Sequence, residues 1–204
     1  MIDEGYMALT IEYTRAQLQQ LSTTELLALF QTLAAPALSE MNGEYRATLL
    51  QQPSWFAQVL GRLTVANPLM PWLCKAFRPV SSELGRGYNT FSLLGKVVQL
   101  YPMQTCIAPS RYDGKLAYQL VYRAYHSLCG DIHMVDEVRQ LAPNLYLGIG
   151  TWGFTAKQRH IPLPFLLEGA IANYRADIGQ DRQGFQHQQE IPALASSFET
   201  GDLS

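Results

Sequence analysis

From residue 72 onward, apolar and polar residues alternate with a period of two, which is typical of antiparallel strands. Short turn signals separate the alternating stretches, and the Asp113-Gly114 pair is the strongest hairpin signal among them. The connections are too short for the crossovers that parallel strands need. With a first strand near residue 41, the pattern predicts eight antiparallel strands, over 41–50, 72–78, 86–91, 96–107, 115–125, 132–140, 145–154 and 163–168.

Helical periodicity is confined to the first third of the chain. Apolar residues recur at helical spacing over 23–33, and Ser22 followed by Glu25 forms a capping-box pattern at the start of that segment. A shorter helix is predicted over 14–21. A third amphipathic helix is predicted over 53–63, directly after the first strand, where a proline fits the first helical turn.

Eight antiparallel strands with short connections commonly close into a barrel with room for side chains or one small ligand. The predicted fold class is therefore all-β with helical additions: an antiparallel β-barrel with N-terminal helices and a helix after the first strand. We assign residues 1–40 to a helical segment that packs on the barrel and residues 41–176 to the barrel itself. Residues 177–204 are polar and are predicted to form a flexible C-terminal tail.

Composition excludes several classes of function. The chain is 48% hydrophobic and 16% charged, and its net charge of -2 gives no general attraction to nucleic acid or to anionic membranes. No apolar run reaches the length of a membrane helix, and the first residues lack the positive charge of a secretory signal, so we expect a cytoplasmic protein. Three cysteines without C-x-x-C spacing indicate reduced, packed thiols: Cys74, Cys106 and Cys129.

Residues 148–153 match the G-x-G-x-x-G pattern of dinucleotide-binding loops. Such a loop must open a helix whose N-terminal amides hold the pyrophosphate. Pro162 and Pro164 fall where the body of that helix would lie, and each would cost about 3 kcal/mol in a helix interior. The glycines therefore indicate a sharply curved strand in a closed sheet.

The sequence predicts neither a cofactor nor a metal centre. The four histidines lie in different segments and lack H-x-x-x-H or H-E-x-x-H spacing. The G-x-S-x-G marker of serine hydrolases is absent, and each cysteine lacks a recognisable catalytic partner.

Candidate site residues lie on strand faces that the alternation assigns to the barrel interior. Tyr118 and Tyr122 place two hydroxyl groups in an apolar wall, where they either orient a ligand or fill the core with local hydrogen bonds. Asp136 lies among apolar neighbours, where burial raises the pKa of a carboxyl group. An ion pair with an arginine such as Arg46 or Arg123 is the alternative for this aspartate.

Tyr146 and Trp152 share a strand face with Gly148 and Gly150. If that face points inward, the glycines open space beside aromatic walls; if it points outward, they only permit strong coiling of the strand. We favour the inward orientation.

Several stretches resemble the lipocalin-like proteins named for a Gly-x-Trp-x-Gly motif. The resemblance begins at residues 27–33 and 40–47, where Tyr45 stands at the position of the tryptophan and Ala47 at that of the second glycine. Residues 72–77 resemble the Trp-Tyr-Gly-Lys-x-Phe stretch of that group, and residues 134–139 resemble one of its late strands. The resemblance implies a barrel of the lipocalin or fatty-acid-binding-protein type, and no particular activity.

These features together favour binding or carriage of a small hydrophobic ligand inside the barrel cavity, such as a lipid, a fatty acid or a pigment-like molecule. No nucleic-acid partner and no integral membrane segment are expected, and the oligomeric state is left open. The candidate ligand-binding residues are Tyr118, Tyr122, Asp136, Tyr146 and Trp152.

Three alternative functions stay open. Asp136 or a tyrosine could move a proton on a small apolar substrate in an enzyme that uses the same cavity. A barrel filled by its own side chains could instead serve as an interaction protein. Nitrobindin-type barrels share the lipocalin-like shape and hold haem through a single histidine, and His160 is the candidate for that role here.

Overall fold

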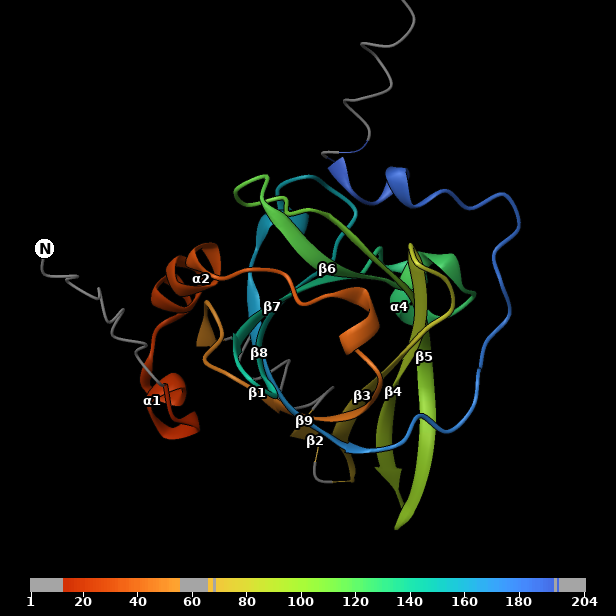
Figure 1. Cartoon of the computed structure of the whole chain (residues 1–204), viewed down its shortest axis with the longest axis horizontal. Helices are drawn as coiled ribbons and strands as arrows, with labels where there is room; N and C mark the ends of the chain where they lie inside the picture. The colour runs from red at the N-terminus through yellow and green to blue at the C-terminus, as the bar shows by residue number, and fades with distance from the viewer. Residues whose placement is uncertain (1–12, 56–65, 68, 193, 195–204) are drawn as a thin grey trace, which may run out of the picture.

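The computed structural model, described for residues 13–55, 66–67, 69–192 and 194, is a closed antiparallel β-barrel (Figure 1). Eight of the nine strands follow one another in the order β1-β9-β8-β7-β6-β5-β4-β3, and β1 pairs with β3 to close the ring. The predicted fold class is confirmed. The strands are β1 (Gly43–Leu49), β2 (Ala66–Asn67), β3 (Met70–Pro79), β4 (Leu84–Leu93), β5 (Lys96–Pro109), β6 (Leu116–Val121), β7 (Val135–Ala142), β8 (Leu145–Thr151) and β9 (Leu163–Ala172).

Between residues 122 and 134 the structure differs from the two strands that the alternation predicted there. After β6 the chain turns into η2 (Tyr122–Ala124) and α4 (Leu128–Asp131), and the strand resumes only at β7. The side chain of Ser127 caps α4 by accepting a hydrogen bond from the Gly130 amide. Tyr122 is nevertheless fully buried in the interior core cluster. This burial explains why the alternation of apolar and polar residues in the sequence continues beyond the end of β6. The predicted helix over 53–63 falls mainly on residues outside those described.

Aromatic rings fill one half of the barrel. Tyr45 packs against Phe77 and Tyr146 with ring centroids 5.5 and 5.6 Å apart, and Phe77 packs edge-on against Tyr118 at 5.4 Å. All four side chains are almost completely buried. These contacts between β1, β3, β6 and β8 make this half of the interior a packed core.

The short helix η1 (Leu38–Glu40) covers the same end of the barrel, and in Figure 1 it overlies the opening of the ring of strands. Leu38 and Met41 belong to the interior cluster. The Tyr45 hydroxyl donates to the Glu40 carbonyl and accepts from the Asn42 amide, each at 3.1 Å. These two hydrogen bonds join η1 and the residues after it to Tyr45, one of the packed aromatic rings of the core.

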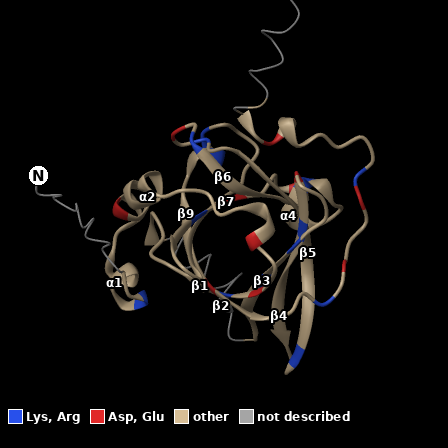
Figure 2. Ribbon diagram, viewed as in Figure 1, with Lys and Arg blue, Asp and Glu red and all other residues tan. Residues whose placement is uncertain are grey.

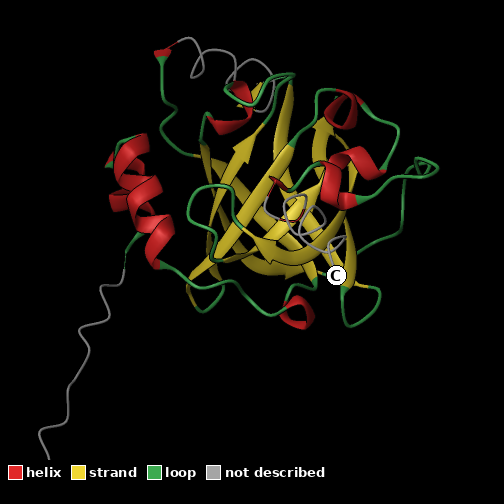
Figure 3. Cartoon of the chain, turned by 90° about the horizontal axis from the view of Figure 1, so that it is seen from above, coloured by secondary structure: helices red, strands yellow, loops and turns green. Residues whose placement is uncertain are grey.

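Helices α1 (Arg15–Gln20) and α2 (Thr23–Thr32) pack on the outside of the barrel (Figure 3). Their buried residues Leu18, Leu26 and Phe30 form a cluster with the outward-facing Leu147 and Ile149 of β8. The capping box predicted at the start of α2 is confirmed. Burial of the outer face of β8 by these helices explains why the sequence there is apolar on both faces.

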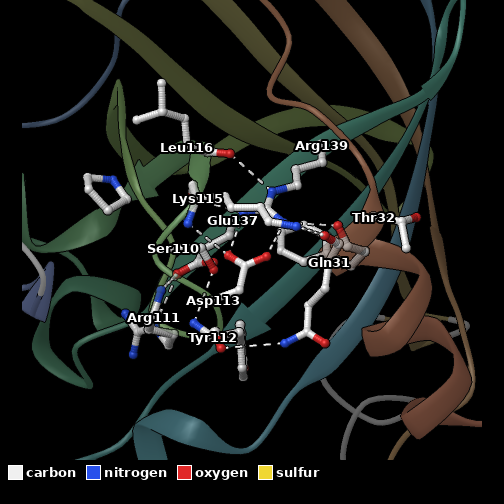
Figure 4. A network of polar contacts seen from close by, with 12 residues as sticks. Gln31, Thr32, Ser110, Arg111, Tyr112, Asp113, Lys115, Leu116, Glu137 and Arg139 are labelled. Atoms are coloured by element: carbon white, nitrogen blue, oxygen red, sulfur yellow. Dashed lines mark hydrogen bonds and ion pairs between the residues drawn. The ribbon is translucent and has the colours of Figure 1, made fainter.

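Arg139 on β7 fastens α2 to the barrel (Figure 4). Its side chain is fully buried, and its guanidinium forms a bidentate pair with Asp113 at 2.7 Å. It also donates to the Phe30 carbonyl at the end of α2 and to the Lys115 and Leu116 carbonyls in the β5–β6 hairpin. One cation therefore satisfies carbonyl groups of two elements and complements the negative end of the helix dipole.

Residues 177–192, expected to be flexible, follow a defined path along the barrel in this structure. Asp177 pairs with Arg78, and the Arg182 amide donates to the Ala124 carbonyl. Ile191 is buried in a cluster with residues of β5, β6 and β7. An apolar residue and specific polar contacts thus place the C-terminal segment against the barrel wall.

Replacing Arg139 with methionine should lower the free energy of unfolding by about 3 kcal/mol or more, because Asp113 and several carbonyl groups lose their partner. Urea denaturation measures this loss. The matched control is Lys157→Met, at an exposed position, which should change stability by less than about 0.5 kcal/mol. A loss below about 1 kcal/mol for Arg139→Met would contradict the role given to this residue.

Hydrogen bonds from Arg139 lower the pKa of Asp113 below its usual value. A depressed carboxyl pKa contributes stability at neutral pH that is lost as the pH falls through the folded-state pKa. The difference in unfolding free energy between wild type and Asp113→Asn should therefore be larger at about pH 7 than at about pH 3. Denaturation at both pH values checks this, and a difference that does not change with pH would refute it.

Candidate functional site

Four polar side chains meet in the half of the barrel interior that lies away from η1. They are Lys75 on β3, Asn89 on β4, Tyr122 in η2 and Asp136 on β7, and none is more than 5% exposed. We call these residues the interior polar cluster. Since a buried charge is costly unless it is paired, the arrangement of these four groups decides what the cluster can do.

The Lys75 ammonium is the centre of the cluster. Its Nζ lies 2.7 Å from Asp136 Oδ2, 3.0 Å from Asn89 Oδ1 and 2.5 Å from the Tyr122 hydroxyl oxygen. These contacts use all three ammonium donors. The Tyr122 hydroxyl in turn donates to Asp136 Oδ2 at 3.0 Å. The cluster is thus a closed network in which an ion pair is reinforced by a phenol and an amide.

Aromatic rings surround the ammonium. Nζ lies 5.1 Å from the centroids of Trp72 and Phe165 and 5.2 Å from that of Tyr122, within the range of cation–π attraction. Gly148 makes this packing possible, because a Cβ there would lie 2.1 Å from Cζ of Phe165. The glycine that belongs to the G-x-G-x-x-G pattern therefore serves close packing of a ring beside Lys75.

A β-bulge in β3 brings Trp72 to the same side as Lys75. The pairing of β3 with β4 shifts between Trp72 and Cys74, which inserts an extra residue and lets two side chains three positions apart both face inward. The Trp72 indole donates to Asn89 Oδ1 at 3.1 Å, beside the bond from Lys75 to the same oxygen. Trp72 is therefore tied into the interior polar cluster.

Burial raises the pKa of Tyr122 well above its usual value, and the Asp136 carboxylate raises it further. The phenol consequently keeps its proton near neutral pH. Burial also raises the pKa of the Cys74 and Cys106 thiols to about 11 and that of Cys129 to about 12. The prediction of reduced, buried cysteines is confirmed, and a protonated thiol is a poor nucleophile.

The predicted tyrosines all lie in the interior. Tyr118 and Tyr146 lie in the half of the barrel interior that aromatic rings fill, and there the Tyr118 hydroxyl donates to Thr105 Oγ1 at 2.9 Å. Tyr122 belongs to the interior polar cluster. The inward orientation of Tyr146 also agrees with the favoured orientation of the β8 face. Trp152, in contrast, lies just beyond the end of β8, is half-buried and is absent from the interior core cluster.

Asp136 is buried in an ion pair as one alternative predicted, but the expected arginine partners are wrong. Its partner is Lys75. Arg46 follows the inward-facing Tyr45 on β1 and is exposed, and Arg123 pairs with Glu190. The lysine reaches Asp136 because β3 and β7 lie on opposite sides of a closed ring, a relation that no local pattern reveals.

Lys75, Asn89 and Trp72 were missed as site residues by the sequence analysis. The available signal was a lysine two residues before Phe77, on the same inward-facing side of an otherwise apolar strand. His160, the residue considered for haem, is exposed in η3 (Gln158–His160), with Nδ1 2.8 Å from the Ala156 carbonyl oxygen.

A groove of about 500 Å³ lies beside the seam between β1 and β3. Ala47 and Trp72, which also pack against the interior cluster, form part of its wall. Arg175 lines the groove but is paired with Glu44 at 2.9 Å, whereas Arg46 has no ion pair within 4.0 Å in the described parts of the chain. The remaining lining residues are Leu73, Cys74, Thr90, Val97, Ile171 and Ala172.

Comparisons with known proteins identify no family. No family model matches the chain, and no curated protein matches it. One solved structure, described as the crystal structure of a protein from Thermomonospora curvata, is similar at 14% sequence identity and a TM-score of 0.46. The match covers 75% of this chain and 90% of that chain. At this level of similarity it carries no argument about function.

Among the described residues, no group of three or more histidine, cysteine, aspartate or glutamate side chains is arranged to hold a metal ion. No helix within the same residues is long and apolar enough to cross a membrane.

Replacing Lys75 alone with methionine should cost about 3–5 kcal/mol in unfolding free energy, because the Asp136 carboxylate loses its cation in a buried site. The double variant Lys75→Met/Asp136→Leu should lose less than the sum of the two single variants, by about 1 kcal/mol or more. Urea denaturation of the four proteins measures this coupling. Additive losses would show that the two side chains act independently.

Proposed function

We propose that the protein binds a small, mostly apolar molecule with an anionic end, non-covalently, in the groove beside the β1–β3 seam. The observation that carries this proposal is the groove itself, in which an apolar wall adjoins Arg46, a guanidinium that has no ion pair with any described residue. Its volume of about 500 Å³ lies within the usual range for small-molecule sites, about 300–1,000 Å³. A ligand of the class expected from the sequence would occupy this groove on the barrel wall, since aromatic rings fill half of the interior.

The charges in the groove favour an anion. Arg175 and Glu44 neutralise each other, which leaves Arg46 as the net positive charge among the lining residues. A guanidinium can hold a carboxylate or a similar group through two parallel hydrogen bonds. The apolar body of the ligand would cover Ala47, Trp72 and Ile171, with about 25 cal/mol gained per Å² of apolar surface removed from water.

The interior polar cluster supports this site through Trp72. The indole forms part of the groove wall, and its N–H bond to Asn89 fixes the ring from the interior side. Because Lys75 binds the same Asn89 oxygen, the ion pair with Asp136 positions the amide that holds the indole. A fixed aromatic wall reduces the ordering cost that ligand binding would otherwise incur.

An enzymatic role has less support. All three donors of Lys75 are used inside the protein, and Tyr122 is fully buried with a raised pKa. Cys74 lines the groove, but its thiol stays protonated at neutral pH. These groups therefore present neither a free base nor an activated nucleophile to the groove.

We also propose kinship with the lipocalin-like group named for the Gly-x-Trp-x-Gly motif. Gly43 stands at the first position of that motif and has a φ of +119°, and a Cβ there would lie 2.7 Å from the Ala172 carbonyl oxygen. Tyr45 stands at the tryptophan position and directs its ring into the core. The positive φ and the close approach of Ala172 give a structural reason for the glycine that the motif requires at this position, and Tyr45 places an aromatic ring in the core where the motif has tryptophan.

The test compares two fluorescent probes, anilinonaphthalene sulfonate, which is anionic, and phenylnaphthylamine, which is neutral. Wild type should bind both. Arg46→Glu should weaken binding of the sulfonate about tenfold and leave the neutral probe unchanged, because only the anion uses the guanidinium. Ile171→Asp, which places a charge in the apolar wall at an exposed position, should weaken both probes.

The matched control is Lys157→Glu, which makes the same change of charge at an exposed position that does not line the groove. It should leave both affinities unchanged. If wild type binds neither probe, or if Lys157→Glu weakens the sulfonate as much as Arg46→Glu does, the proposed site is wrong.

A further inference from the structure

The β4–β5 hairpin extends beyond the barrel as a two-stranded ribbon with an apolar tip. Leu94 at the turn is 87% exposed, and Leu93 and Val97 beside it are 43% and 46% exposed. Neighbouring apolar residues at the end of a hairpin normally cost solubility without adding to the core. Their exposure together points to a surface that meets an apolar environment.

The backbone at the tip is also unfavourable for leucine. Leu93 pairs with Lys96, so the loop has two residues, and Leu94 and Gly95 have φ angles of +49° and +78°. Such a turn requires positive φ at both central positions and strongly prefers asparagine followed by glycine. Leu94 is therefore both strained and exposed, a combination that stability does not explain.

Charge along this part of the chain is one-sided. Residues 50–73 and 84–109 contain no aspartate or glutamate, although the chain has 17 acidic residues, and they carry Arg62, Arg86 and Lys96. Lys96 lies directly beside the turn, and the ribbon in Figure 2 carries no red along β4 and β5. An apolar tip flanked by a lysine, in a hairpin that has no acidic residue of its own, complements an anionic and apolar surface.

We infer that the β4–β5 hairpin tip docks onto an anionic lipid surface. Leu93, Leu94 and Val97 enter the interface between headgroups and acyl chains, while Lys96 lies at the level of the phosphates. A lipid surface fits all three observations, because it accepts exposed leucines, attracts the cation and does not repel the acid-free ribbon. This inference goes beyond the proposed ligand and does not depend on it.

Val97 also lines the groove beside the β1–β3 seam. Docking through the tip therefore brings the groove close to the lipid. An amphipathic ligand with an anionic end, which rests on the proposed function, could then pass between the lipid surface and the groove with little exposure to water.

The experiment is flotation of the full chain with vesicles of phosphatidylcholine and phosphatidylserine, compared with vesicles of phosphatidylcholine alone. Wild type should float with the mixed vesicles and bind the neutral ones about fivefold more weakly, since one lysine near anionic lipid contributes about 1 kcal/mol. Lys96→Glu should remove the preference for the anionic vesicles. Added salt should weaken binding of the wild type, since Lys96 is exposed and its attraction to the phosphates is screened.

Leu94→Asn separates docking from folding. Asparagine favours the turn, so this variant should melt at a higher temperature than wild type while its vesicle binding falls about tenfold. The matched control is Leu116→Asn, an exposed leucine paired with Pro109 at the opposite end of β5, which should keep full vesicle binding. Arg46→Glu should also keep vesicle binding even where it loses the sulfonate probe, so the two proposals can fail separately.

Three results would overturn the inference. Wild type binds phosphatidylserine vesicles no better than neutral ones; Leu94→Asn keeps full binding; or Leu116→Asn loses as much as Leu94→Asn. Concentration-dependent dimers in sedimentation that disappear in Leu94→Asn, without vesicle binding by the wild type, would assign the tip to self-association instead.

Discussion

The positive charge of Lys75 inside the barrel is the constraint on which the rest of the site depends. An ammonium removed from water must find a counter-ion and hydrogen-bond acceptors, and the barrel supplies them from four different segments: Asp136, Asn89, Tyr122 and the rings around them. Gly148 admits the Phe165 ring and a bulge in β3 turns Trp72 inward. Both local irregularities, the glycine and the bulge, place an aromatic ring beside Nζ of Lys75.

The same constraint divides the barrel into two functional halves. Rings from Tyr45, Phe77, Tyr118 and Tyr146 pack the half beneath η1, which gives the fold a rigid core. The other half carries the polar cluster and, through Trp72, one wall of the groove. Arg139 plays a comparable part on the outside, where one buried guanidinium joins α2 to the β5–β6 hairpin. Two buried cations therefore organise the inside and the outside of one sheet.

Much of the fold could be predicted from the sequence because a period of two is a local property. The alternation predicted eight strands and the inward faces of Tyr118, Asp136 and Tyr146, and the equally local Asp113-Gly114 turn signal predicted the β5–β6 hairpin. The partner of Asp136 could not be predicted, since Lys75 is distant in sequence and meets it only when the ring closes. The path of residues 177–192 depends in the same way on contacts with the finished barrel. Trp152 was predicted as a strand residue because the alternation continues past the point where β8 ends.

The measurement that tests the account most directly is heteronuclear NMR of the lysine ammonium groups at neutral pH. The account predicts that the Lys75 ammonium protons exchange slowly with water and stand apart from those of Lys96, Lys115 and Lys157, and that this signal changes in Asp136→Asn. A Lys75 ammonium that exchanges as fast as the three other lysines, in wild type and variant alike, would contradict the buried ion pair and the role that it has in holding Asn89 and Trp72.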